Sequence, residues 1–69
     1  MDTQAEQAVR DAMAGPEPHN TVTVPELARQ ALGNDLRSSD RVYKAIAEMV
    51  SRGELEAPSE QWKSWKLLS

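Results

Sequence analysis

The sequence has no cysteine and no phenylalanine, and its aromatic residues are limited to two tryptophans and one tyrosine. Without cysteine, neither a disulfide framework nor a cysteine-based zinc site can form. Long apolar runs are also missing, which excludes a membrane span, and the opening MDTQAEQ is acidic and polar, unlike a signal peptide. We therefore expect a soluble protein of the cytoplasm with no membrane partner.

The chain is short and mildly acidic. Its 69 residues suffice for one small domain, expected to span 1–69, and are too few for a catalytic cleft between two layers. The formal net charge is −3, which argues against a protein that coats nucleic acid through bulk electrostatics. Residues 1–32 hold five acids and two bases, whereas residues 33–69 hold six of each. Any surface that binds a nucleic acid must therefore be a local patch, because the chain as a whole is not basic.

Two T-x-x-E capping boxes predict the first two helices. The box at 3–6 opens a helix near 4–14 and the box at 23–26 opens another near 24–32, each followed by apolar residues at helical spacing. Between them, GPEPHN (15–20) is typical of an exposed loop, with Gly15 as a left-handed helix end. The alternating TVTV also favours a short strand at 21–23.

A third helix and a change of period follow. Gly33 and Asn34 tolerate positive φ and can end the second helix. Ser38 or Ser39 supplies an N-cap for a third helix over 38–52, and Gly53 ends it. Beyond it, ELEA and QWKSWKLL alternate apolar and polar residues, which predicts a hairpin over 54–68 with its turn at Pro58. We expect one core built from Val9, Met13, Leu27, Leu32, Val42, Ile46, Met49, Leu55, Trp65 and Leu67.

This order of elements resembles a winged helix-turn-helix domain, and the resemblance covers essentially residues 3–69. TVPELARQALG resembles the second helix of that family, and RVYKAIAEMVSRGELE resembles its third helix running through Gly53 into the first wing strand. Gly33 precedes Val42 by nine residues, against six in the tightest versions of the motif, which suits the longer turns of winged variants. The resemblance implies a mainly α fold with a small β-hairpin wing (α+β), whose third helix enters the major groove of double-stranded DNA.

Helical geometry indicates which side chains this resemblance would bring to DNA. With Val42 and Ile46 inward, Arg41 and Lys44 project from the opposite side. Arg41 is expected to grip a guanine edge with its planar guanidinium, and Lys44 suits phosphate or guanine. The complete expected set adds the helix start, the tyrosine hydroxyl and the wing cations: Arg37, Ser38, Ser39, Arg41, Tyr43, Lys44, Lys63 and Lys66.

Structural roles for the same residues stay open at this point. Arg41 and Lys44 could be charges on a solvated helix face, and Tyr43 could be a residue at the boundary of the core. Lysines such as 63 and 66 also protect edge strands against aggregation. The two tryptophans favour core packing over base stacking, because the chain has no phenylalanine to fill its interior.

The sequence offers no support for catalysis. His19 is the single histidine, and it lies in a proline-rich loop with no third group to orient it toward Ser38 or Ser39. The glycine-containing stretches lack the spacing of a phosphate-binding loop. We expect no enzyme activity, no cofactor, no metal and no small-molecule substrate.

Two functional hypotheses follow from these observations. The first is a small sequence-specific DNA-binding protein, a transcriptional regulator of bacterial or phage type that is associated with the nucleoid. The second is a winged-helix protein-interaction module that binds a host partner or forms a homodimer. Its motivation is the acidic total and the carboxylates near the same face, which are Asp35, Asp40, Glu48, Glu54, Glu56 and Glu60.

Overall fold

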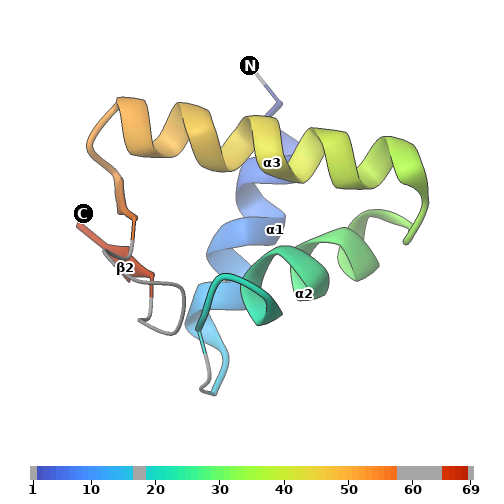
Figure 1. The fold of residues 1–69 in the computed structure, drawn as a ribbon, viewed down its shortest axis with the longest axis horizontal. Coiled ribbons are helices and arrows are strands. Elements are labelled where there is room, and N and C mark those ends of the chain that lie inside the picture. The colour runs from blue at the N-terminus through green and yellow to red at the C-terminus, as the bar shows by residue number, and fades with distance from the viewer. Residues whose placement is uncertain (1, 17–18, 58–64, 69) are drawn as a thin grey trace.

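The computed structural model describes residues 2–16, 19–57 and 65–68. Its helices are α1 (Thr3–Ala14), α2 (Thr23–Leu32) and α3 (Leu36–Ser51), and its strands are β1 (Leu55–Glu56) and β2 (Lys66–Leu67). The long α3 crosses α1, α2 lies beside both, and the strands lie near the C-terminal end of α3 (Figure 1). The predicted mainly helical class is confirmed, with the three helices in the predicted order. Among the described residues, no helix combines the length and apolar character that a membrane crossing requires.

The helix α1 begins one residue earlier than its capping box predicted. Asp2 is the N-cap, and its carboxylate accepts a hydrogen bond from the Ala5 amide at 3.1 Å. The predicted pairing of Thr3 with Glu6 is therefore wrong, and the Glu6 side chain turns instead to two arginines described below. Asp2 satisfies one of the amides that a helix start leaves without a partner.

The start of α2 is built by Asn20. Its side-chain oxygen accepts hydrogen bonds from the amides of Val22 and Thr23 at 2.9 and 2.8 Å, and its own amide donates to Thr23 Oγ1 at 3.2 Å. This reciprocal pairing has the logic of a capping box, with Asn20 and Thr23 in the two roles. It folds residues 21–23 into the entry of the helix, so the short strand expected there is wrong.

The helix α3 begins at Leu36, because Asp35 and not a serine is its N-cap. The Asp35 carboxylate accepts a hydrogen bond from the Ser38 amide at 2.7 Å, where the positive end of the helix dipole also favours a negative charge. Hydrogen bonds from the backbone amide and the side chain of Ser38 hold the pKa of the Asp35 carboxyl below its usual value. Ser38 consequently lies inside the first turn as a buried residue, so the predicted N-cap at Ser38 or Ser39 is wrong.

The helix ends follow the sequence more closely. Gly33, Asn34 and Gly53 all have positive φ, as predicted. The Asn34 amide closes α2 onto the Arg29 carbonyl at 2.9 Å, a bond that satisfies a carbonyl of the last turn. Gly15 differs, since its φ of −78° and ψ of 176° are extended. The predicted left-handed cap is wrong there because Pro16 favours an extended residue before it.

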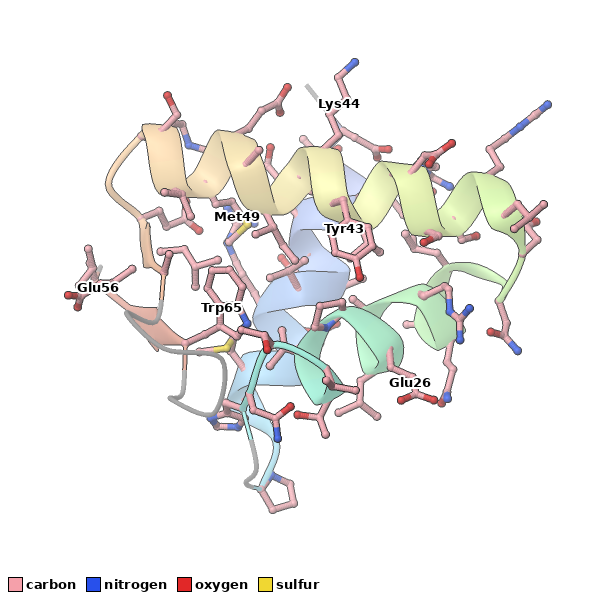
Figure 2. The ribbon with its side chains drawn as sticks, in the orientation of Figure 1. Glu26, Tyr43, Lys44, Met49, Glu56 and Trp65 are labelled. Atoms are coloured by element: carbon pink, nitrogen blue, oxygen red, sulfur yellow. The ribbon has the colours of Figure 1, made fainter. Side chains whose placement is uncertain are left out.

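One apolar cluster joins the three helices and β1. It comprises Ala8, Val9, Ala12, Met13, Val24, Ala28, Val42, Ile46, Met49 and Leu55, with Leu32 and Trp65 packed against it. Figure 2 shows Met49 directed from α3 toward the interior, on the side where Trp65 lies. Leu27 was wrongly assigned to this core, since it is 45% exposed and α2 buries Val24 and Ala28 instead. The side chain of Leu67 lies outside the described part of the chain.

The C-terminal strand is tied to two other segments. Strands β1 and β2 are antiparallel, with Leu55 opposite Leu67 and Glu56 opposite Lys66. The Leu68 amide donates to the Glu54 carbonyl, and the Trp65 amide donates to the His19 carbonyl, both at 2.8 Å. Two paired strands were predicted within 54–68, whereas the predicted turn falls at 58–64, outside the described residues.

Candidate nucleic-acid interface

Arg41 is bound to the beginning of α1. Its guanidinium donates to the two Asp2 carboxylate oxygens at 2.7 and 3.0 Å, and to Gln4 Oε1 at 2.9 Å. Two parallel bonds of this kind hold both side chains in one geometry. The hydrogen bond from Arg41 is the main reason that the pKa of the Asp2 carboxyl falls to about 2. Arg41 therefore links α3 to α1, although the sequence indicated that it would project outward.

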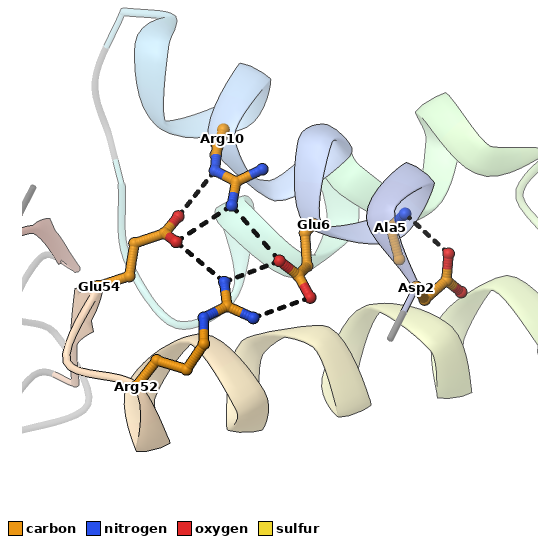
Figure 3. A network of polar contacts seen from close by, with 6 residues as sticks. All are labelled: Asp2, Ala5, Glu6, Arg10, Arg52 and Glu54. Carbon is orange, nitrogen blue, oxygen red and sulfur yellow. Dashed lines mark hydrogen bonds and ion pairs between the residues drawn. The ribbon is translucent and has the colours of Figure 1, made fainter.

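Two more arginines are neutralised by a ring of ion pairs (Figure 3). Arg52 donates to both Glu6 oxygens at 3.1 and 2.7 Å and to Glu54 at 2.9 Å. Arg10 donates to Glu54 at 2.7 and 3.0 Å and to Glu6 at 3.3 Å. Hydrogen bonds from Arg10 and Arg52 lower the pKa of Glu54 to about 2. The ring joins α1, the end of α3 and the segment before β1.

Glu6 is the member of this ring that most needs its partners. Its side chain is only 2% exposed, so its charge would be unfavourable without compensation. The hydrogen bond from Arg52 is the main cause that lowers the pKa of Glu6. The three arginines on the α1 side thus serve the fold itself and present little free charge.

The remaining arginine and lysine side chains that the structure describes lie on α2 and α3. Arg29, Arg37 and Lys44 form no ion pair within the ranges that the structure describes. Arg29 lines a shallow groove between α2 and α3 together with Ser39 and Tyr43. Arg37 and Lys44 line a second groove, between α3 and the start of α1. Among these residues, positive charge that is free to meet a ligand therefore lies on both flanks of the exposed face of α3, with Arg29 on the α2 side and Arg37 and Lys44 on the α1 side.

The exposed face of α3 has an apolar side and a charged side. The apolar stripe consists of Leu36, Tyr43, Ala47 and Val50, whose spacing places them along one line of the helix. Leu36 is 88% exposed, Tyr43 59% and Val50 37%. The charged row consists of Arg37, Asp40, Lys44 and Glu48, nearer the start of α1. Figure 2 shows the division, with Lys44 directed away from α2 and Tyr43 on the α2 side.

The residues predicted for DNA contact fall into different environments. Arg37, Tyr43 and Lys44 are exposed, Ser39 is half-buried in the groove beside α2, and Ser38 is buried. Lys63 lies among residues 58–64, outside the described part of the chain, and Lys66 is placed only through its strand pairing with Glu56. Arg29 was missed, because its position beside Tyr43 depends on how α2 packs against α3.

Comparison of this chain with protein-family models, with curated proteins and with solved structures finds no match. Its function must therefore be inferred from the chemistry of the exposed face of α3 and its two flanks.

Proposed function

We propose that this chain is a winged helix-turn-helix protein that binds double-stranded DNA through α3, with the two short strands as the base of its wing. The observation that carries the proposal is the sorting of cations within the described residues. Arg10, Arg41 and Arg52 are held by carboxylates, whereas Arg29, Arg37 and Lys44 keep their charge along the two flanks of the exposed face of α3. A DNA-binding protein needs its unpaired positive charge on the face that meets the phosphates.

The exposed face of α3 has chemistry suited to both phosphates and base edges. Arg37 and Lys44 are seven residues apart, which places them about 10.5 Å from each other along one side of the helix. These two cations are assigned to phosphates flanking the major groove, and Arg29 to a phosphate reached from α2. On the exposed face of the same helix, Asp40 can accept a hydrogen bond from a cytosine amino group and Ala47 can contact a thymine methyl group.

Arg41 has a positioning role in this proposal. Because its guanidinium already binds Asp2 and Gln4, it fixes α3 against α1 and leaves base contact to other side chains. A recognition helix that is held in place loses less conformational freedom when it binds. Arg41→Ala is therefore expected to lower stability while the affinity of the folded protein for duplex changes little.

Salt dependence gives a quantitative expectation. Three phosphate contacts predict a slope of about −2.7 for the logarithm of affinity against the logarithm of salt concentration. Affinity should then fall about 40-fold between roughly 50 and 200 mM salt. Each of Lys63 and Lys66 that also meets a phosphate would add about −0.9 to the slope.

The test is fluorescence anisotropy of labelled DNA duplexes across a salt series. Lys44→Ala and Arg37→Ala should each weaken binding to all sequences and reduce the slope by about 0.9. Arg41→Ala is the charge-matched control, with folding checked by circular dichroism. The proposal fails if the wild-type protein shows no salt-dependent binding, or if Arg41→Ala loses as much affinity as Lys44→Ala while it remains folded.

A second candidate function is a winged-helix protein-interaction module. The apolar stripe favours it, because side chains as exposed as Leu36 and Tyr43 gain most from burial against another protein surface. Tyr43→Ala should then abolish binding of a protein partner, whereas removal of the Lys44 charge should matter less. Duplex binding that survives Tyr43→Ala but not Lys44→Ala would assign the face to DNA.

A further inference from the structure

We propose that the same face of α3 binds a second copy of this chain, with the two α3 helices antiparallel across a two-fold axis beside Tyr43. The pairing itself is inferred from the apolar stripe and the charged row. Its consequence for DNA, given below, rests on the proposed function.

The apolar stripe is nearly symmetric about its centre. Leu36 lies seven residues before Tyr43, and Val50 lies seven residues after it. In an antiparallel pair with Tyr43 at the axis, Leu36 of each copy meets Val50 of the other, and the two tyrosine rings meet each other. Such a self-complementary patch is what a two-fold interface requires.

The charged row selects the same register. Its signs alternate along α3 in the order Arg37, Asp40, Lys44, Glu48, so the reversed row carries the opposite sign at each position. With Tyr43 at the axis, Asp40 lies within two residues of the position opposite Lys44 of the second copy, and Arg37 lies within one residue of the position opposite Glu48. These offsets are about 3 Å and about 1.5 Å along the helix, which the long side chains can bridge. The two-fold axis is perpendicular to the plane that contains the two antiparallel helices. It therefore keeps the charged rows of both copies on the same side of the interface, where they face each other. Symmetry repeats each pairing, which gives four ion pairs between the copies.

The alternating charges remain available for a partner. Helical spacing would let Asp40 or Glu48 pair with Lys44 inside one helix. Within the described residues, however, no member of the charged row pairs with another. In a parallel two-fold pair the two charged rows would lie on opposite sides of the interface, where their opposite charges could not meet. The charges therefore favour the antiparallel pair.

The predicted dimer is weak and competes with DNA. Only one helix from each copy forms the contact, so the buried area should lie below about 1,200 Å², in the range of transient complexes. In the dimer, Arg37 and Lys44 are paired with carboxylates of the second copy and cannot reach phosphates. If α3 binds DNA as proposed, the chain binds it as a monomer, and self-association sets the fraction of chains that are free to do so.

Sedimentation equilibrium across protein concentrations from about 10 μM to about 1 mM tests the pairing. The wild-type mass should rise from 7.7 kDa toward twice that value. Lys44→Asp places carboxylates opposite each other at both symmetric positions, so the dissociation constant should increase about tenfold or more. The double variant Asp40→Lys/Lys44→Asp restores opposite charges and should restore the dimer. Asp11→Lys, an exposed change on α1, is the control and should leave the dimer unchanged.

The outcomes separate this inference from the proposed function. A monomeric mass at every concentration overturns the pairing, as does a double variant that stays folded but remains as weak a dimer as Lys44→Asp. The same proteins are tested with labelled duplex at concentrations far below the dimer dissociation constant, where every chain is a monomer. Duplex binding without a dimer would leave the proposed function intact, and a dimer without duplex binding would leave only the pairing.

Discussion

Removal of the Met49 side chain is predicted to destabilise the fold severely. Met49 has the largest of the fully buried side chains in the described residues, and it belongs to the cluster shared by all three helices and β1. Truncation of a buried methionine to alanine costs about 2–5 kcal/mol, and the upper half of that range applies where the surroundings cannot collapse into the cavity. A chain of 69 residues has a total unfolding free energy of roughly 3–10 kcal/mol. A loss of about 3 kcal/mol for Met49→Ala should therefore remove roughly a third of the stability or more.

Thermal unfolding followed by circular dichroism measures this effect. For a domain of this size each kcal/mol lowers the melting temperature by about 4–8 °C, so a loss of about 3 kcal/mol predicts a decrease of roughly 12–24 °C. Leu27→Ala is the matched control, because Leu27 is 45% exposed and its truncation should cost about 1 kcal/mol or less. Equal melting temperatures for the two variants would refute the assignment of the core.

Three further predictions concern the caps and the ion pairs. Since the folded-state pKa values of Asp2 and Glu54 are lowered to about 2, their pairing stabilises the fold above the pKa of the unfolded chain. The melting temperature should consequently decrease as the pH falls from about 5 toward 2, and a constant value over that range would contradict the ion pairs. Asn20→Ala should cost about 1 kcal/mol in chemical denaturation, because two amides at the entry of α2 lose their acceptor. An unchanged midpoint would mean that these two bonds do not stabilise the helix. Gly53→Ala should cost about 1–2 kcal/mol from the left-handed backbone alone, since a Cβ at Gly53 meets no atom within 4 Å; stability equal to that of the wild type would mean that the turn is not left-handed.

Helix positions and helix ends could be predicted because their signals are local. The 3.6-residue periodicity of Val42, Ile46 and Met49 depends only on neighbours along the chain, and so does the need for glycine at positive φ. Helix starts were less predictable, since more than one nearby residue can cap the same amide. At α1 the competition was decided by tertiary structure, because Glu6 binds Arg52 in preference to its own helix start.

The candidate site was predicted only in part, because some of its contacts join residues that are far apart in the sequence. The exposure of Tyr43 and Lys44 follows from the face of α3 that the core leaves free. Arg41 lies on the edge of that face, and its partner Asp2 is 39 residues away in the chain. No pattern of neighbouring residues predicts a contact between residues so far apart, although Asp2 and Arg41 are both present in the sequence. The position of Arg29 beside α3 likewise depends on helix packing.

The proposed DNA-binding face is tested most directly by NMR titration of the isotope-labelled chain with a short duplex at about 50 mM salt. The largest changes in amide chemical shift should occur at Arg37, Tyr43, Lys44 and Ala47 on α3 and at Arg29 on α2, while the amides of α1 change little. Raising the salt concentration should reverse these changes. Spectra that do not change on addition of duplex, or changes confined to α1, would contradict DNA binding through α3.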